Sequence, residues 1–337
     1  MTLRVGLMGF GRLGRSIFRI LHNRDDIDVV VISDIADHEN LAYLLRYDTI
    51  LGRFPHQVSI ANDQLFARGK PTTMLSGKEP GDVDWRAHNV DIVIEATRKH
   101  MPYATLSKHI DAGAKRLLLC VAPTDKADVT VVMGVNNDDL KDEHKIISNA
   151  SITAHCATPI AKVIDQAFGI ERLYITSVHA YTNDQSLSDV PSYEMRRSRA
   201  ASENIIPSQT ATAKILMDVL PQLQNKVSAM TLNVPVINGS LIDMVAYTQN
   251  KITKESINAA IESAADSDFK DLIEYSTDPI VSSDVKQSPH SSVFDSLATV
   301  TMGNKLVKMI AWYDNGWGYA NRVVDLMEHL QKKGMVA

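Results

Sequence analysis

The chain has 337 residues, of which 45% are hydrophobic and 22% charged, the composition of an ordinary globular protein long enough for two domains. Its formal net charge of −5 excludes the basic surface that attracts nucleic acid or an anionic membrane. No run of residues approaches a membrane-spanning length, and a strand-like start gives no signal peptide. Two cysteines, Cys120 and Cys156, form neither a disulfide framework nor a zinc-binding spacing, so we expect a cytoplasmic protein without a metal.

A glycine-rich turn follows the first predicted strand, residues 3–8, and precedes a helical pattern at 15–21. The turn has the spacing G-x-G-x-x-G and consists of Gly9, Phe10, Gly11, Arg12, Leu13 and Gly14. Glycines in this spacing allow a tight turn and let a pyrophosphate approach the helix N-terminus. The alternative is a purely structural turn.

A second predicted strand, residues 29–33, ends in Asp34. A carboxylate at this place accepts hydrogen bonds from ribose hydroxyls and repels a 2′-phosphate. The two features together predict a site for NAD rather than NADP.

Further short apolar stretches predict a mostly parallel sheet. They cover residues 90–95, 116–121 and 129–133, and helical or turn-like segments separate them. The more polar region 47–88 predicts an excursion of short strands. We therefore expect an α/β Rossmann domain, doubly wound around this sheet.

The segment 148–159 reads S-N-A-S-I-T-A-H-C-A-T-P. It resembles the active-site segment of the phosphorylating glyceraldehyde-3-phosphate dehydrogenase family, S-N-A-S-C-T-T-N-C-x-x-P. The match places the family's nucleophilic cysteine at Ile152. A branched alkyl group has no lone pair and no acidic proton, so it cannot attack an aldehyde.

Three other segments, 178–185, 204–214 and 310–326, carry the same resemblance. Details such as S-P-H-S-S at 288–292 resemble the erythrose-4-phosphate dehydrogenase branch of this family. The resemblance implies an NAD-binding Rossmann domain at 1–150 and an α+β catalytic domain with a largely antiparallel sheet at 151–315. It also implies a C-terminal helix, 316–337, that packs back on the NAD-binding domain, and a homotetramer.

The resemblance assigns roles to individual residues. His179 falls on the catalytic histidine, a group that titrates near neutrality and suits proton transfer. Thr97 would lie near the adenine, Asn315 would hold the nicotinamide carboxamide, and Tyr319 would flank its ring. The residues that match the family's anion-binding set are Ser151, Thr153, Thr182, Arg196, Arg199 and Thr210. The substrate is accordingly expected to be a small anionic molecule, although the arginines at 196–199 could equally form a solvated or subunit-facing patch.

Several positions depart from the family pattern. Asn233 stands where the family has the arginine that anchors the substrate phosphate, a charge-assisted contact worth about 1.5–3 kcal/mol. Ala211 and Arg98 replace glycines, and Gly316 replaces a glutamate. Nucleophile and phosphate anchor are altered together, which indicates changed chemistry.

Another group could in principle replace the missing thiol. Cys156 follows Ile152 by one helical turn, about 6 Å along the axis, so a buried structural thiol is the alternative to a relocated nucleophile. His155 is a surface or hydrogen-bonding residue, or one that touches the substrate. Cys120 on its strand is expected to be a small buried hydrophobe.

Three functions remain open on this sequence. The first is non-covalent hydride transfer between NAD(H) and a carbonyl or alcohol, with His179 as acid/base. The second is an inactive NAD-binding paralogue with a regulatory or assembly role. The third is binding of an anionic metabolite without redox chemistry.

Overall fold

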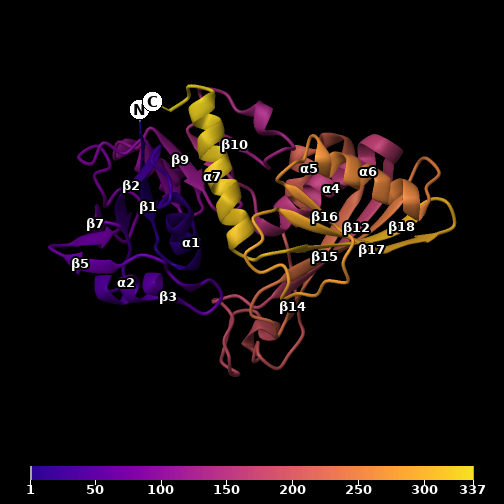
Figure 1. Cartoon of the computed structure of the whole chain (residues 1–337), viewed down its shortest axis with the longest axis horizontal. Coiled ribbons are helices and arrows are strands. Elements are labelled where there is room, and N and C mark those ends of the chain that lie inside the picture. Colours follow the sequence, from indigo (N-terminus) through magenta and orange to yellow (C-terminus); the bar gives the residue numbers. More distant parts are fainter. Residues whose placement is uncertain (1, 337) are drawn as a thin grey trace. The chain divides into compact units, whose positions relative to one another are not determined.

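The computed structural model describes residues 2–336, which form two compact units (Figure 1). The first unit takes the chain up to Val131, residues 137–150, and the chain from Ala320 onward. The second unit consists of Val132–Asn136 and Ser151–Tyr319. Within residues 2–336 we find no helix with both the length and the apolar character needed to span a membrane.

The first unit contains a nine-stranded sheet in the order β10-β11-β9-β8-β1-β2-β7-β6-β5. Neighbouring strands are parallel from β10 to β7, whereas β5, β6 and β7 pair antiparallel. In chain order the strands are β1 (Leu3–Met8), β2 (Ile27–Ser33), β5 (Val58–Ala61), β6 (Gln64–Ala67), β7 (Lys70–Leu75), β8 (Ile92–Glu95), β9 (Arg116–Leu119), β10 (Val129–Thr130) and β11 (Ile146–Ser148). This is the expected mostly parallel Rossmann sheet.

Helices and a small ladder complete the first unit. The ladder pairs β3 (Tyr47–Asp48) with β4 (Gly52–Arg53). The helices are α1 (Arg12–Leu21), α2 (His38–Arg46), α3 (Tyr103–Asp111) and the short η1 (Asn137–Asp139). A last helix, α7 (Trp317–Lys332), begins in the second unit and continues in the first.

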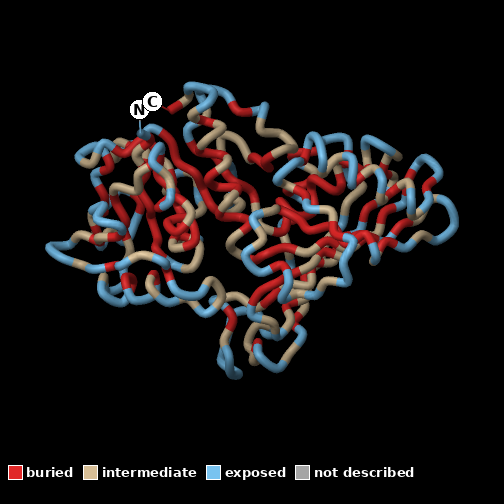
Figure 2. The backbone as a smooth tube through the Cα atoms, viewed as in Figure 1, coloured by how far each residue is buried: buried red, intermediate tan, exposed pale blue. Residues whose placement is uncertain are grey.

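The central strands of the first sheet are apolar because they are covered on both faces. Val5 and Leu7 of β1 are fully buried, as are Val93 and Ile94 of β8. Figure 2 shows this buried backbone running through the sheet. Short continuous apolar runs of this kind are typical of parallel strands, which is why the sequence indicated them.

The second unit contains a seven-stranded sheet in the order β13-β14-β12-β15-β18-β17-β16. Most neighbouring pairs are antiparallel, while β12 pairs parallel with β14 and β16 with β17. The strands are β12 (Ile170–Ala180), β13 (Ile206–Ser208), β14 (Val227–Val234), β15 (Ser240–Thr248), β16 (Ile273–Ser276), β17 (Ser292–Met302) and β18 (Leu306–Tyr313). The expected α+β domain with a largely antiparallel sheet is confirmed.

Helices pack against this second sheet. They are α4 (Ile152–Phe168), α5 (Thr212–Val219), α6 (Lys254–Asp266) and the short η2 (Met195–Ser198) and η3 (Pro221–Leu223). Helix α4 contacts β12, β15, β17 and β18, whereas α5 contacts β14. The alternation along β12 matches this arrangement, because Leu173, Ile175 and Ser177 are buried whereas Tyr174 is 45% exposed.

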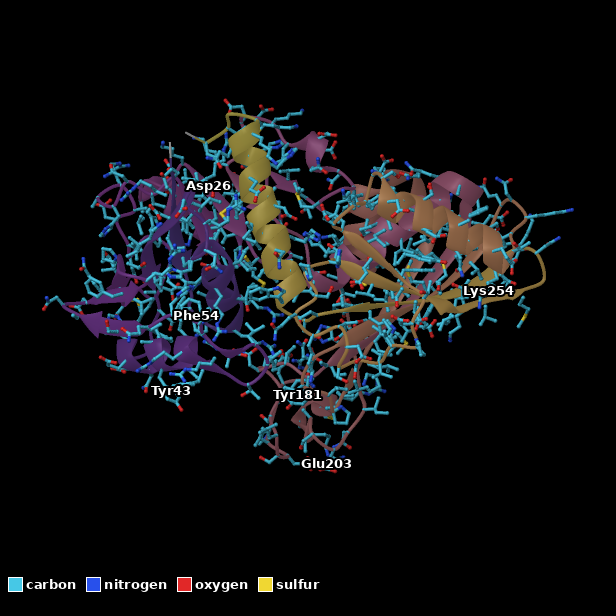
Figure 3. The ribbon with its side chains drawn as sticks, in the orientation of Figure 1. Asp26, Tyr43, Phe54, Tyr181, Glu203 and Lys254 are labelled. Carbon is cyan, nitrogen blue, oxygen red and sulfur yellow. The ribbon has the colours of Figure 1, made fainter. Side chains whose placement is uncertain are left out.

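His22 belongs to an aromatic cluster in the first unit. Its ring stacks on Phe18 with centroids 5.4 Å apart, and it lies 5.4 Å from the ring of Phe54, which is labelled in Figure 3. The residue is only 8% exposed. Burial, reinforced by the nearby cations His56, Arg68 and Lys70, lowers the pKa of His22 to about 4.

This depressed pKa makes stability depend on pH. Between about pH 6.5 and pH 4 the unfolded chain holds a proton at this position that the folded chain does not. The free energy of unfolding therefore falls as the pH falls through this window.

We expect His22→Phe to remove this part of the acid sensitivity while keeping the ring stack. Melting temperatures measured between pH 7.5 and pH 5 should fall less for the variant than for the wild type. His144→Phe, at a partly exposed histidine, is the control and should follow the wild type. If the melting temperatures of the wild type and of His22→Phe fall equally between pH 7.5 and pH 5, His22 is not a source of the acid sensitivity.

Candidate active site

The glycine-rich turn of the first unit lies between β1 and α1, where its glycines have distinct roles. Gly9 has a φ of +95°, and a Cβ on it would lie 2.9 Å from the backbone nitrogen of Thr97. A Cβ on Gly14 would lie 2.2 Å from the carbonyl oxygen of Gly9. A Cβ on Gly11, the residue before α1, would meet no atom within 4 Å. Two glycines therefore close the turn, and the third leaves space at the helix N-terminus that fits a pyrophosphate.

Asp34 connects this turn to the end of β2. Its Oδ2 accepts a hydrogen bond from the backbone N–H of Phe10 at 2.6 Å, and its Oδ1 accepts one from the N–H of Ala36 at 2.9 Å. The residue is partly exposed. The carboxylate is thus fixed beside the glycine-rich turn, where the sequence predicts contact with the ribose.

Thr97 follows β8 and is held by a buried network. Its N–H donates to Glu95 Oε1 at 2.8 Å, and its hydroxyl bonds to the same oxygen. Glu95 Oε2 lies 3.3 Å from His109 Nε2, and Trp85 donates to His109 Nδ1 at 3.0 Å. Glu95 and His109 are fully buried. Thr97 is therefore rigidly placed next to Gly9.

Arg98 is exposed and has a φ of +60°. This left-handed conformation costs an arginine more than a glycine, which explains why the family pattern has glycine here. Of the two alternatives for Arg98, the exposed side chain fits the solvated one.

His179 lies at the end of β12 in the second unit. Its Nδ1 is 2.6 Å from the carbonyl oxygen of Ala180 and 3.3 Å from Nδ2 of Asn315. A carbonyl oxygen accepts and an amide nitrogen donates, so Nδ1 of His179 meets an acceptor at Ala180 and a donor at Asn315. Ser240 donates to Asn315 Oδ1 at 2.9 Å and accepts from the N–H of Ala180 at 2.9 Å. The imidazole ring is therefore held in place by the backbone at the end of β12 and by Asn315.

Tyr313, the last residue of β18, lies next to this histidine, with ring centroids 6.0 Å apart. Its hydroxyl is 3.0 Å from Ser177 Oγ and 3.2 Å from Thr153 Oγ1. Tyr313 is 1% exposed, and burial raises its pKa to about 12. It stays neutral over the physiological range and acts as a hydrogen-bonding support.

Ile152 is the first residue of α4, with Ser151 as the N-cap whose Oγ accepts from the N–H of Ala154 at 3.2 Å. Ile152 is partly exposed. Cys156 is fully buried within the same helix, and burial raises the pKa of its thiol well above the ordinary value. A buried, protonated thiol is a poor nucleophile, and these observations favour the structural alternative.

His155 is 1% exposed, so the surface alternative is wrong. Its ring meets the ring of Tyr319 edge to face, with centroids 5.6 Å apart. The fourth residue of α4 turns inward, and the aromatic contact accounts for its burial. Cys120 is buried at 5% exposure, as expected.

The predicted anion-binding residues do not form one cluster of free donors. The Thr182 hydroxyl donates to Oδ1 of Asp184, whose Oδ2 pairs with Arg197. Arg199 pairs with Asp189 at 3.1 Å and is largely exposed. The Oγ1 atom of Thr210 is 2.8 Å from Oγ1 of Thr212. Arg196 lines a shallow hollow on the surface.

Sequence reasoning missed several supporting residues. Asp314 accepts from the N–H groups of Gly316 and Trp317 at 2.7 and 2.6 Å, and so caps the start of α7. Asn238 donates to Asp314 at 2.7 Å and accepts from the N–H of Asn315 at 2.9 Å. Asp314 belongs to the motif W-Y-D-N, so the sequence could have indicated it as a site residue. In the described part of the chain, no group of three or more His, Cys, Asp or Glu side chains could hold a metal ion.

We expect Asp34→Asn to weaken NAD⁺ binding by about tenfold and to narrow the preference over NADP⁺, because it removes the charge and keeps a hydrogen-bond acceptor for Phe10. Asp34→Ala should narrow the preference further. Calorimetry with both nucleotides measures this. Asp37→Asn, at the N-cap of α2, is the control. Wild-type protein that binds NADP⁺ as tightly as NAD⁺ would contradict the assignment.

We expect iodoacetamide to leave the native protein unmodified, because both cysteines are buried and burial raises both thiol pKa values. Intact mass spectrometry should show two adducts only after denaturation. Ile152→Cys is the positive control, since a partly exposed thiol at a helix N-terminus should react quickly. Rapid alkylation of Cys156 in the native wild-type protein would support the alternative that Cys156 is the nucleophile.

Comparison with known proteins bears on both units. The model of the glyceraldehyde 3-phosphate dehydrogenase C-terminal domain matches residues 151–315, and that of the NAD binding domain of the same enzyme matches residues 3–101.

Full-length relatives agree with these matches. Glyceraldehyde-3-phosphate dehydrogenase 2 of Streptomyces avermitilis is 46% identical over 328 residues, which cover 97% of this chain and 98% of the relative. Glyceraldehyde-3-phosphate dehydrogenase 1 of Bacillus subtilis is 43% identical, covering 99% and 100%, and the Geobacillus stearothermophilus enzyme is 42% identical with the same coverage. The chain therefore belongs to the glyceraldehyde-3-phosphate dehydrogenase family of NAD-dependent oxidoreductases, and its cofactor is NAD.

Proposed function

We propose that the protein transfers hydride between NAD(H) and the carbonyl or alcohol carbon of a small molecule, with His179 as acid/base and without a covalent intermediate. The observation that carries the proposal is the held orientation of His179. Its Nδ1 faces the Ala180 carbonyl at 2.6 Å, while position 152 of the same unit bears an alkyl group. The base is kept and the nucleophile is gone.

The residue assignments for the cofactor follow the family resemblance. We assign the pyrophosphate to the turn from Gly9 to Gly14, the adenosine ribose to Asp34 and the adenine side to Thr97. Asn315 and Tyr319 are assigned to the nicotinamide. When bound, NAD(H) accepts or supplies the hydride.

The protein's own part in the reaction is proton transfer and positioning. In the oxidising direction, Nε2 of His179 takes the proton of the substrate hydroxyl as the hydride leaves the carbon. In the reducing direction the imidazolium returns that proton to the new alkoxide, so aldehyde, NADH and H⁺ give alcohol and NAD⁺. Tyr313 and Asn315 support the ring from two sides. Ordinary phosphorylating oxidation of glyceraldehyde 3-phosphate needs a thioester and is not expected.

Domain limits and assembly complete the proposal. We assign residues 1–150 to cofactor binding, 151–315 to catalysis and 316–337 to a helix that returns to the first domain. We also propose a cytoplasmic homotetramer. The exposed tyrosines Tyr174 and Tyr247, on the sheet face away from the helices, support self-association because they are 45% and 42% exposed.

The alternative is a catalytically inactive NAD-binding paralogue with a regulatory or assembly role. The loop 181–205 favours it, because Leu187, Tyr193 and Met195 are large apolar side chains that the loop leaves exposed. Tyr181 and Glu203, labelled in Figure 3, lie near the two ends of this loop. Exposed apolar side chains suit a partner surface.

We expect His179→Asn to lower NAD(H)-coupled turnover at least about a hundredfold with nearly unchanged cofactor affinity, because a positioned acid/base contributes about 10²–10⁴-fold. Turnover is followed by NADH absorbance with small aldehydes and alcohols, and affinity by calorimetry. Cys156→Ser should be nearly silent by comparison. A broad substrate screen without NAD-coupled turnover would favour the inactive paralogue. Loss of turnover in Cys156→Ser alone would favour the relocated thiol.

A further inference from the structure

Asn233 and His179 lie on adjacent strands in direct register. Strand β12 pairs parallel with β14, and the pairing matches His179 with Asn233. Neighbouring strands are about 4.8 Å apart, and residues in register point to the same face of the sheet. A small molecule whose reacting carbon lies at His179 therefore has its other end within reach of Asn233.

The hydrogen-bond partner of Asn233 is an uncharged side chain. Asn233 is 6% exposed, and its Nδ2 donates to Oε1 of Gln185, which is 7% exposed. The same oxygen also accepts from the backbone N–H of Thr182 at 3.2 Å. A buried amide pair thus occupies the place where the family resemblance puts an arginine and a phosphate.

Gln185 also has a hydrogen-bond donor without a partner in the part of the chain that the structure describes. Its Nε2 is buried and has no hydrogen-bond partner within the described residues. Leaving such a group unpaired costs free energy, and a substrate oxygen would relieve this cost. A hydroxyl or carbonyl oxygen suits a neutral amide donor, whereas a buried phosphate needs charge compensation that amides do not give.

Arg197, which lies close to Thr182 through Asp184, is already engaged in an ion pair. Asp184 receives the Thr182 hydroxyl through Oδ1 and pairs with Arg197 through Oδ2. The charges of this pair cancel, and the acidic member lies next to the threonine that was expected to bind an anion. A phosphate that bound to the Thr182 hydroxyl would lie close to the Asp184 carboxylate, which repels it.

We propose that the subsite formed by Thr182, Gln185 and Asn233 takes an uncharged, hydroxyl-bearing end of the substrate, so the substrate is an unphosphorylated short-chain hydroxyaldehyde or the corresponding polyol. This inference rests on the proposed function for the position of the reacting carbon. The proposed uncharged end of the substrate differs from the sequence-based expectation that Thr182 binds an anionic group. Ser151, Thr153 and Thr210, which were also expected to bind an anion, are not part of this subsite.

The turnover test compares two substrates that differ only in the phosphate. With NADH, kcat/KM for D-glyceraldehyde should exceed that for D-glyceraldehyde 3-phosphate by at least tenfold. The double variant Asp184→Asn/Asn233→Arg should shift the ratio toward the phosphorylated compound by at least a hundredfold, because it removes the acidic charge and supplies a cationic one. A wild-type preference for the phosphorylated compound, with turnover that depends on His179, would overturn the subsite and leave the proposed function standing.

A binding test works without turnover. We use calorimetry of sn-glycerol 3-phosphate with the NAD⁺-loaded protein. Asp184→Asn frees Arg197 and should raise the affinity at least tenfold, and adding Arg197→Gln should abolish the gain. Asp243→Asn is the matched control. It breaks an ion pair of the same kind, with Lys308, and Asp243 lies opposite Thr176 of β12, away from the proposed subsite.

The two tests separate the two claims. A gain in phosphate affinity in Asp184→Asn without any NADH-coupled turnover of aldehydes would support the neutral subsite and overturn the hydride-transfer proposal. Unchanged affinity in Asp184→Asn and in Asn233→Arg, each with a wild-type melting temperature, would overturn the subsite. Asp184 is half exposed, so its variant should fold even if Asn233→Arg does not.

Discussion

The position of β12 between β14 and β15 is the constraint on which the catalytic half of the structure depends. Pairing with β14 sets His179 beside Asn233, and pairing with β15 brings Ser240 to the backbone of Ala180. Because β15 also pairs with β18, Tyr313 reaches the same place. A slip of one residue in β12 would turn His179 to the opposite face of the sheet and separate it from every one of these groups.

Much of the first unit could be predicted from the sequence, because its signals are local. The turn from Gly9 to Gly14 is short, and its conformation depends on residues that lack a Cβ. Asp34 could be found for the same reason, since it ends an apolar strand. Strand limits were less accurate, and β10 is shorter than the apolar run at 129–133 that indicated it.

Partner choice in the second unit could not be predicted in the same way. Arg196, Arg197 and Arg199 are near neighbours in sequence, yet Arg197 is the one that meets Asp184. The loop 181–205 has no periodic pattern, so only its folded path decides which side chains meet. The burial of His155 likewise depends on Tyr319, which is far away in sequence. Local patterns carry no information about such contacts.

The two departures from the family pattern that we propose to matter, at Ile152 and Asn233, are linked by physical chemistry. A covalent mechanism fixes the substrate by a bond to the enzyme, so the remote end of the substrate needs only to be delivered. In the reaction that we propose there is no such bond, so non-covalent contacts alone would hold the carbonyl carbon in line with the hydride and with His179, and an error of 1 Å is costly. Buried amide donors at Asn233 and Gln185 suit this requirement, because their hydrogen bonds are directional and fix orientation as well as position. The neutral subsite is therefore the kind of anchor that a hydride-transfer enzyme without a nucleophile needs.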